Sequence, residues 1–238
     1  MTMLIAHRGL SAEHPENSVA AVSAALTHVH TVEIDVRCSA DLVPVCTHDG
    51  SLARTHGVDA RVVDRTAAQL RREAPGLATL AELLDIVADE DAAVMLDVKV
   101  ADRASIDAIC AVVRASRITW NDGRQVRRGE YLDARTATFQ SADPQLLRSV
   151  RARTGAGCLE LVRGGSTTRQ LLVGAPFITT YAQGVTLPES LAAPRTIRVL
   201  HALRLGSYAY TVNDAPRMRE LSAAGVDGIY TDRCNAVP

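Results

Sequence analysis

The chain has 238 residues, of which 47% are hydrophobic and 22% are charged, and its formal net charge is −1. A chain of this size buries about 70% of its unfolded surface, which predicts a globular protein and excludes a disordered, fibrous or disulfide-dense one. The near-neutral charge and the 3% aromatic content argue against nucleic acid as a partner, and the lack of a long apolar stretch argues against stable membrane insertion.

Cysteine usage indicates a reducing compartment. The five cysteines are odd in number and include no C-x-x-C pair, so we expect buried free thiols rather than a disulfide framework or a zinc site. An apolar strand already begins at Met3, which leaves no room for a signal peptide. We therefore expect a cytoplasmic protein.

Short apolar runs alternate with amphipathic stretches along almost the whole chain. The predicted strands are Met3–Arg8, Val32–Arg37, an extra strand Leu42–Thr47, Val94–Lys99, Ala137–Ser141, Gly157–Val162, Ile178–Val185, Ser207–Val212 and Gly228–Thr231. The predicted helices are Asn17–His28, Leu80–Asp89, Ser105–Ser116, Pro144–Arg153, Thr196–Leu205 and Ala215–Ala224. Thr79 and Glu82 have the spacing of a capping box, and Gly225 follows the last helix where a helix end favours glycine.

This alternation fits two α/β architectures, a (β/α)8 barrel of about 250 residues or a doubly wound open sheet. The first strand is not followed by G-x-G-x-x-G, the signature of the dinucleotide-binding open sheet. Residues 50–78 do not follow the strand–helix rhythm and are interpreted as an insertion, and residues 118–136 form a second irregular segment.

Acidic side chains interrupt strands that should be apolar. Glu33, Asp35 and Arg37 alternate along one strand and so share a face, and Asp97 and Lys99 share a face of another strand. Converging buried carboxylates need compensation, and oxygen ligands favour Mg²⁺ or Ca²⁺, with Mn²⁺ also compatible. The alternative is an ion-pair ladder on a solvated sheet face.

Two of the seven histidines stand at strand ends, each followed by a polar or charged residue. His7 closes the first strand and His48 closes the extra strand. Because an imidazole titrates near neutral pH, two of them beside a cation could act as general base and general acid on opposite sides of a phosphorus atom. A structural role is the alternative for either residue taken alone.

Several motifs, in order and spacing, resemble the glycerophosphodiester phosphodiesterase family. The resemblance covers nearly the whole chain and is carried by His7-Arg8-Gly9, Pro15-Glu16-Asn17-Ser18, Glu33-x-Asp35, His48-Asp49, Leu52-x-Arg54-Thr55, Tyr210-Thr211-Val212-Asn213 and Gly225-Val226-Asp227-Gly228 with the strand after it. It implies one (β/α)8 TIM-barrel domain over residues 1–238, with residues 50–78 as a small insertion after the second strand.

The resemblance also implies a metal-dependent phosphoric diester hydrolase that cuts glycerophosphodiesters to glycerol 3-phosphate and an alcohol. Its matching positions give His7 and His48 as the acid/base pair, Glu33, Asp35 and Asp97 as ligands of one divalent cation, and Arg8 and Lys99 as phosphate-binding residues. It specifies neither the alcohol nor an oligomeric state.

The chain departs from the family pattern at two positions. Asp97 and Lys99 replace the usual I-E-I-K with D-x-K, which also occurs in the related sphingomyelinase D group. Tyr210 replaces the Trp of W-T-V-N, so a ring with a hydroxyl would contact the substrate. Two alternatives remain beside hydrolysis: a phospholipase D-like lyase that forms a cyclic phosphate, and a non-catalytic barrel that binds a phosphate ligand.

Overall fold

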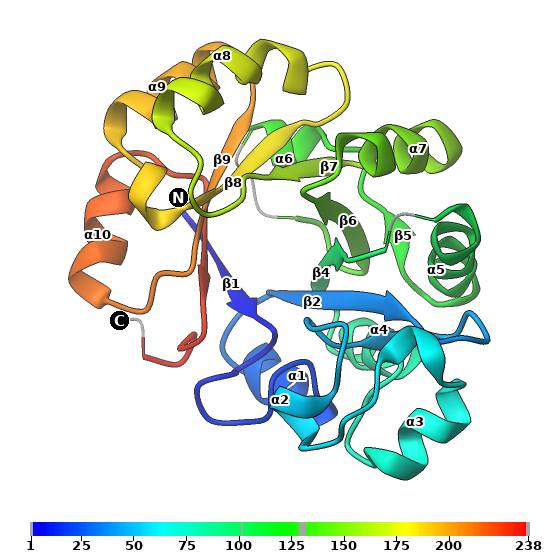
Figure 1. Cartoon of the computed structure of the whole chain (residues 1–238). Coiled ribbons are helices and arrows are strands. Elements are labelled where there is room, and N and C mark those ends of the chain that lie inside the picture. Colours follow the sequence, from blue (N-terminus) through cyan, green and yellow to red (C-terminus); the bar gives the residue numbers. More distant parts are fainter. Residues whose placement is uncertain (1, 101, 129–131, 237–238) are drawn as a thin grey trace.

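The computed structural model describes residues 2–100, 102–128 and 132–236, and it confirms the (β/α)8 barrel (Figure 1). Eight parallel strands form the wall, and pairing of the first with the second closes it. These strands are β1 (Met3–His7), β2 (Thr31–Cys38), β4 (Ala93–Val98), β6 (Thr136–Ser141), β7 (Cys158–Leu161), β8 (Gly184–Pro188), β9 (Gly206–Tyr210) and β10 (Gly228–Thr231).

Helices on the crossovers surround this wall, as Figure 1 shows. They are α1 (Val19–Leu26), α4 (Leu80–Asp89), α5 (Arg103–Ala115), α7 (Pro144–Thr154), α8 (Thr168–Ile178), α9 (Pro194–Ala202) and α10 (Ala215–Ala223), with the 3₁₀ turn η2 (Glu189–Leu191) before α9. The expected capping box is present at α4, where the Thr79 hydroxyl accepts from the Glu82 amide and the Glu82 carboxylate accepts from Thr79 N.

The stretch after β2 carries its own small elements. Strand β3 (Pro44–Cys46) pairs antiparallel with β2, as the extra-strand prediction implies. Helix α2 (Ala53–His56), the 3₁₀ turn η1 (Val62–Asp64) and helix α3 (Ala67–Glu73) follow it, and α3 is drawn in turquoise at the lower right of Figure 1. A separate cluster of buried apolar side chains holds these elements together, with Leu52, Val62 and Leu70 at its centre.

One predicted strand is wrong. Residues 178–183 do not begin a strand, because α8 continues to Ile178 and β8 starts only at Gly184. Gly174 and Pro176 obscure the helical pattern in the sequence, although Pro176 stands close enough to the helix end to be accommodated. Thr167 and Gln170 form a capping box that marks the start of this unpredicted helix.

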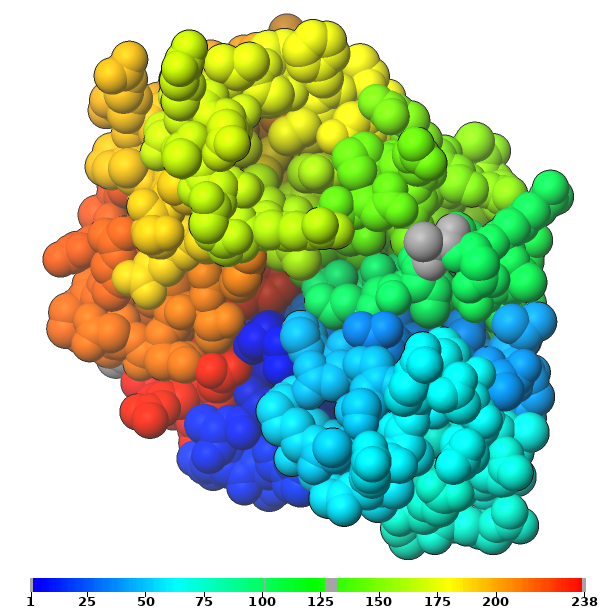
Figure 2. Space-filling model, in the orientation of Figure 1, coloured from blue at the N-terminus to red at the C-terminus, as the bar shows by residue number. Residues whose placement is uncertain are grey.

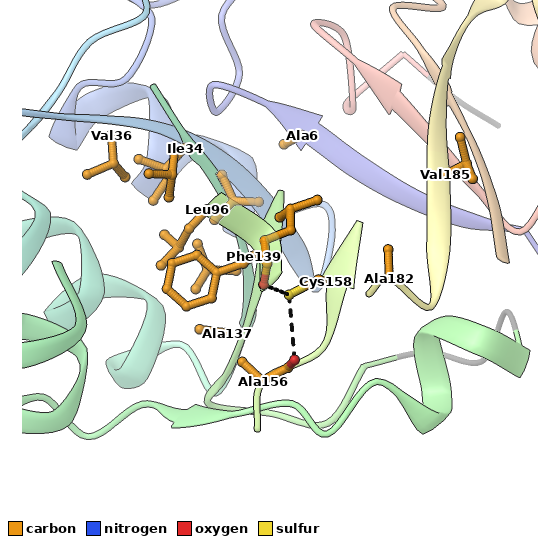
Figure 3. Close-up of a cluster of buried hydrophobic side chains, with 14 of the residues drawn as sticks. Ala6, Ile34, Val36, Leu96, Ala137, Phe139, Ala156, Cys158, Ala182 and Val185 are labelled. Carbon is orange, nitrogen blue, oxygen red and sulfur yellow. Dashed lines mark hydrogen bonds between the residues drawn. The ribbon is translucent and has the colours of Figure 1, made fainter. Parts of the chain in front are cut away.

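Alternation along the strands separates two apolar clusters. Side chains that point out of the barrel pack beneath the helices, among them Ile34, Leu96 and Phe139 (Figure 3). Cys158 lies in this layer, where its thiol donates to the carbonyl oxygens of Ala156 and Leu147, 3.6 and 3.8 Å away. All five cysteines are free and buried, as predicted.

The second cluster fills the barrel at the end where the strands begin. Met3, Ile5, Met95 and Leu159 surround the rings of Tyr208 and Tyr230 there. A segment that the sequence left irregular closes this end: β5 (Thr119–Trp120) pairs with β6, and α6 (Arg124–Arg128) follows it. The Tyr208 hydroxyl donates to the Val126 carbonyl oxygen of α6 at 3.2 Å.

Inward-facing glycines make this closure possible. A methyl group on Gly206 would lie 2.1 Å from the Val126 carbonyl oxygen, and one on Gly228 would lie 2.4 Å from the Tyr208 ring. The polar side chains that point into the barrel lie at the opposite end, where the strands finish. Within the described residues, no helix has both the length and the apolar character needed to cross a bilayer.

Candidate active site

Three buried carboxylates meet where β2 and β4 approach their carboxyl ends. Asp35 and Asp97 are register partners, and Glu33 stands one inward position earlier on β2. Each side chain offers an oxygen within 4.8 Å of the others, and the residues are 1–4% exposed. We call Glu33, Asp35 and Asp97 the acidic triad. Strand alternation alone places its members on one face, as the sequence predicted.

Burial and mutual repulsion perturb the pKa values of the triad. Burial raises the pKa of Glu33 well above its usual range, and the neighbouring carboxylates add to this effect. Burial also raises the pKa of Asp97, and attraction to Lys99 only partly opposes it. The pKa of Asp35 is lowered in spite of its burial, because Lys99 and Arg8 both stabilise its charged form.

Two cations contact the triad directly. Lys99 Nζ lies 2.6 Å from Asp97 Oδ2 and 3.2 Å from Asp35 Oδ1. Arg8 Nε lies 3.1 Å from Asp35 Oδ2, and the Arg8 backbone amide donates to Glu33 Oε2 at 3.0 Å. The structure thus brings Arg8 and Lys99 to the carboxylates, but their charges do not cover all three.

A loop residue without a predicted role fixes the position of Asp35. Asn17 is buried, and its side chain makes two hydrogen bonds of 3.0 Å, one to the Asp35 carboxylate and one from the Asp35 amide. This arrangement leaves Asp35 little rotational freedom. The motif containing Asn17 was visible in the sequence, but its pairing with a residue 18 positions away was not.

The imidazole of His7 is held by a carboxylate that directly follows the last strand. His7 Nδ1 lies 2.7 Å from Asp232 Oδ1, and Asn213 Nδ2 donates to Asp232 Oδ2 at 2.7 Å. Ser11 Oγ also donates to Asp232 Oδ1. These donors help to lower the pKa of Asp232 to about 2 although burial opposes it. Because an ionised carboxylate only accepts, the His7 proton resides on Nδ1 and Nε2 is left for other contacts.

The imidazole of His48 is held in a similar manner by its neighbour. His48 Nδ1 lies 2.8 Å from Asp49 Oδ1, and Arg54 Nε donates to Asp49 Oδ2 at 2.5 Å. The same Arg54 guanidinium donates two hydrogen bonds to Glu16, whose carboxylate also accepts from Arg8 at 3.1 Å. A continuous chain of ion pairs therefore runs from His48 to Arg8, a residue that contacts the triad.

Tyr210 and Arg37 complete the surroundings of the triad. The Tyr210 hydroxyl donates to the Val162 carbonyl oxygen at 2.7 Å, and burial raises the pKa of the phenol. Arg37 does not form the ion-pair ladder considered above: its guanidinium donates to the backbone carbonyl oxygens of His48 and Lys99. The alternative of a solvated ladder is wrong for this strand, since Glu33 and Asp35 are buried.

The acidic triad fits a hard divalent cation. All its donors are carboxylate oxygens, and Oδ1 of Asp97 is buried without a hydrogen-bond partner among the described residues. A buried oxygen of this kind costs free energy unless a donor or a cation meets it. Oxygen ligands of this number suit Mg²⁺ or Ca²⁺ completed by water or substrate.

Comparison with known proteins gives a family match over most of the chain. The model of the Glycerophosphoryl diester phosphodiesterase family matches residues 7–236. A Bacillus altitudinis glycerophosphodiester phosphodiesterase is 23% identical over 245 residues, covering 98% of this chain and 95% of its own. The rat glycerophosphodiester phosphodiesterase 1 is 42% identical over 72 residues, which cover 30% of this chain but only 22% of the rat protein.

A solved structure has the same fold. The Oleispira antarctica phosphodiesterase in complex with the product sn-glycerol-3-phosphate aligns with a TM-score of 0.82 at 21% identity, covering 99% of this chain and 95% of its own. The barrel of this chain therefore has the fold of a solved phosphodiesterase.

Proposed function

The chain belongs to the glycerophosphoryl diester phosphodiesterase family, and we propose that it hydrolyses glycerophosphodiesters to glycerol 3-phosphate and an alcohol. The observation that carries the proposal is the pair of imidazoles, each held by a carboxylate, at the barrel end that holds the acidic triad. The product complex of the Oleispira phosphodiesterase and the names of the curated relatives support the same reaction. Residues 50–78 would be an insertion in this one catalytic domain.

Glu33, Asp35 and Asp97 would hold one divalent cation, Mg²⁺ or Ca²⁺. Such a cation, when bound, supplies Lewis-acid stabilisation of negative charge on the phosphate. The raised pKa of Glu33 fits this role. When no cation is bound, a proton on Glu33 removes part of the negative charge that a cation would neutralise.

Arg8 and Lys99 would contact the non-bridging phosphate oxygens. Both side chains are 17% exposed, so each faces the carboxylates and retains access to a ligand at the mouth of the barrel. A guanidinium offers two parallel donors to an oxyanion, whereas an ammonium acts as a point charge. The Tyr210 ring would line the same mouth, close enough for Asp97 and Lys99 to affect its pKa.

His7 and His48 would move the two protons of the reaction. Hydrolysis breaks the P–O bond to the alcohol: water supplies a hydroxyl to phosphorus, and the alkoxide gains a proton. One imidazole Nε2 takes the proton from the nucleophile, and the other gives a proton to the leaving oxygen. Asp232 and Asp49 hold the opposite nitrogens and stabilise the imidazolium that forms.

The test is a metal-dependence series with a panel of glycerophosphodiesters that bear choline, ethanolamine, glycerol or inositol. We expect hydrolysis that a chelator abolishes and that Mg²⁺ or Ca²⁺ restores. His7→Ala and His48→Ala should each lower kcat by about 10²- to 10⁴-fold, because an alkoxide is a poor leaving group without a general acid.

His28→Ala is the matched control, because His28 is an exposed histidine outside the site. Phosphorus NMR of the products separates hydrolysis from the lyase alternative suggested by the Asp97-x-Lys99 pattern, since a lyase releases a cyclic phosphate. Near-normal turnover in either histidine variant, or binding without turnover under every metal condition, would refute the proposal.

A further inference from the structure

A cavity opens beside the acidic triad. It lies at the carboxyl ends of β4, β6 and β7, has a volume of ≈ 360 Å³ and shares Asp97 and Lys99 with the candidate active site. The β4–β6–β7 wall and α7, which border it, are the green part of Figure 1, and Figure 2 shows the same orientation with side chains filled in. Its apolar lining comes from short or aliphatic residues, and its remaining charged residues are Arg37, Asp143 and Arg163. A cavity of this size is at the lower end of the range for small-molecule sites.

Arg37 is a half-buried cation without an acidic partner. Its Nε donates to the His48 carbonyl oxygen at 2.9 Å and Nη1 to the Lys99 carbonyl oxygen at 3.3 Å. No carboxylate of the described residues lies within 4 Å of its guanidinium nitrogens. An anion in the cavity would provide the missing compensation.

Arg163 brings a second uncompensated cation to the same cavity. It is exposed and forms no ion pair with any residue in the described ranges. Asp143 is the one other acid of the cavity besides Asp97, and its carboxylate caps α7 by accepting from the amides of Gln145 and Leu146. Lys99 pairs with Asp97, and the two positive charges of Arg37 and Arg163 exceed the one negative charge of Asp143. The charged residues that line the cavity therefore sum to one positive charge.

We propose that this cavity binds the alcohol part of the substrate and favours alcohols that carry a second anionic group, a phosphate or a carboxylate. This inference rests on the proposed function, which places the scissile phosphate at the triad. The glycerol part of every such substrate is neutral, so only the alcohol can supply the anion that Arg37 and Arg163 lack. Choline and ethanolamine, which are cations, are disfavoured there.

The experiment compares glycerophosphoglycerol with glycerophosphoglycerol phosphate, which differ by one phosphomonoester. We expect kcat/KM to be higher for the phosphate-bearing substrate. Arg163→Gln and Arg37→Gln should each reduce this preference by about twofold to fivefold, because an exposed or half-exposed charge contact contributes modestly. Raising the salt concentration should reduce the preference as well. Arg169→Gln is the matched control, since Arg169 is exposed on the next helix and does not line the cavity.

Binding of the same two compounds, measured by calorimetry in the presence of a chelator, gives a second readout that needs no turnover. The inference is supported if the phosphate-bearing compound binds more tightly and both arginine variants weaken that binding. This holds even if no substrate is hydrolysed, because the absence of hydrolysis would contradict only the proposed function. Equal kcat/KM and equal affinity for the two compounds overturn the inference. An equal loss for both compounds in Arg37→Gln also overturns it, because Arg37 would then serve the scissile phosphate.

Discussion

Arg54 connects the two loops that carry His48 and Arg8, and its replacement is a direct test of how the site is positioned. Its guanidinium donates to Asp49, which holds His48, and to both oxygens of Glu16, which holds Arg8. We expect Arg54→Ala to lower kcat, because Asp49 and Glu16 lose their shared partner. Arg8 and Lys99, the proposed phosphate-binding residues, are not changed, so KM should change less.

The structure sets the size of the two effects. The Arg54 side chain is 52% exposed, so its ion pairs together contribute about 1 kcal/mol after solvent screening. A loss of that size lowers Tm by about 2–4 °C in a chain of this length. The effect on kcat should be larger, about tenfold, because a displacement of about 1 Å in a catalytic group can cost up to about a hundredfold.

The assay measures kcat, KM and Tm for Arg54→Ala beside Arg117→Ala. Arg117 has a similar exposure of 51% and pairs with Asp89 at 2.7 Å, but its side chain contacts no residue of the candidate site. Arg54→Lys should recover part of kcat, since an ammonium keeps the charge but does not reproduce the forked contacts. If Arg54→Ala and Arg117→Ala lose equal Tm and both retain normal kcat, the bridge is only structural and the reasoning fails.

The remaining predictions concern orientation, packing and pH. Asp232→Asn should lower kcat about a hundredfold or more with little change in Tm, since the amide no longer fixes the proton on His7 Nδ1; steady-state kinetics at saturating substrate checks this. Gly206→Ala should destabilise the fold by about 1–3 kcal/mol in a denaturant titration, because its methyl group would collide with the Val126 carbonyl. Burial raises the pKa of Glu160 from 4.5 to about 7, so the folded state binds this proton more tightly and stability falls as the pH rises through that window. Glu160→Gln should flatten the dependence of Tm on pH between these values; an unchanged slope would contradict the assignment.

The sequence predicts the barrel because its signals are local. Strands that are buried on both sides are short apolar runs, and glycine, proline and capping residues mark their connections. The helix over 80–89 begins where the capping box predicts. The misplaced strand at 178–185 shows the limit of this approach, since Gly174 and Pro176 weaken the helical signal of α8 while the packing of its apolar side tolerates both.

The carboxylates of the site follow from the same periodicity, but their supports do not. Glu33 and Asp35 stand out because a polar residue at every second position of a buried strand has few structural explanations. Asp232 is 225 positions from His7, and Arg54 is 38 positions from Glu16. Such pairs arise only when the barrel closes, and no periodic pattern of a single sequence encodes them.

The charge of the candidate site explains why a diester suits it. The acidic triad exceeds Arg8 and Lys99 by one negative charge when all five groups are ionised. A divalent cation would turn this excess into one positive charge, which matches the single negative charge of a phosphodiester. The product monoester carries a charge of about −1.5 to −2 at neutral pH. While it is bound, the site would have excess negative charge, which favours release of the product. A second anionic group on the substrate would need compensation elsewhere, and Arg37 and Arg163 are the cations that the structure leaves for it within the described residues.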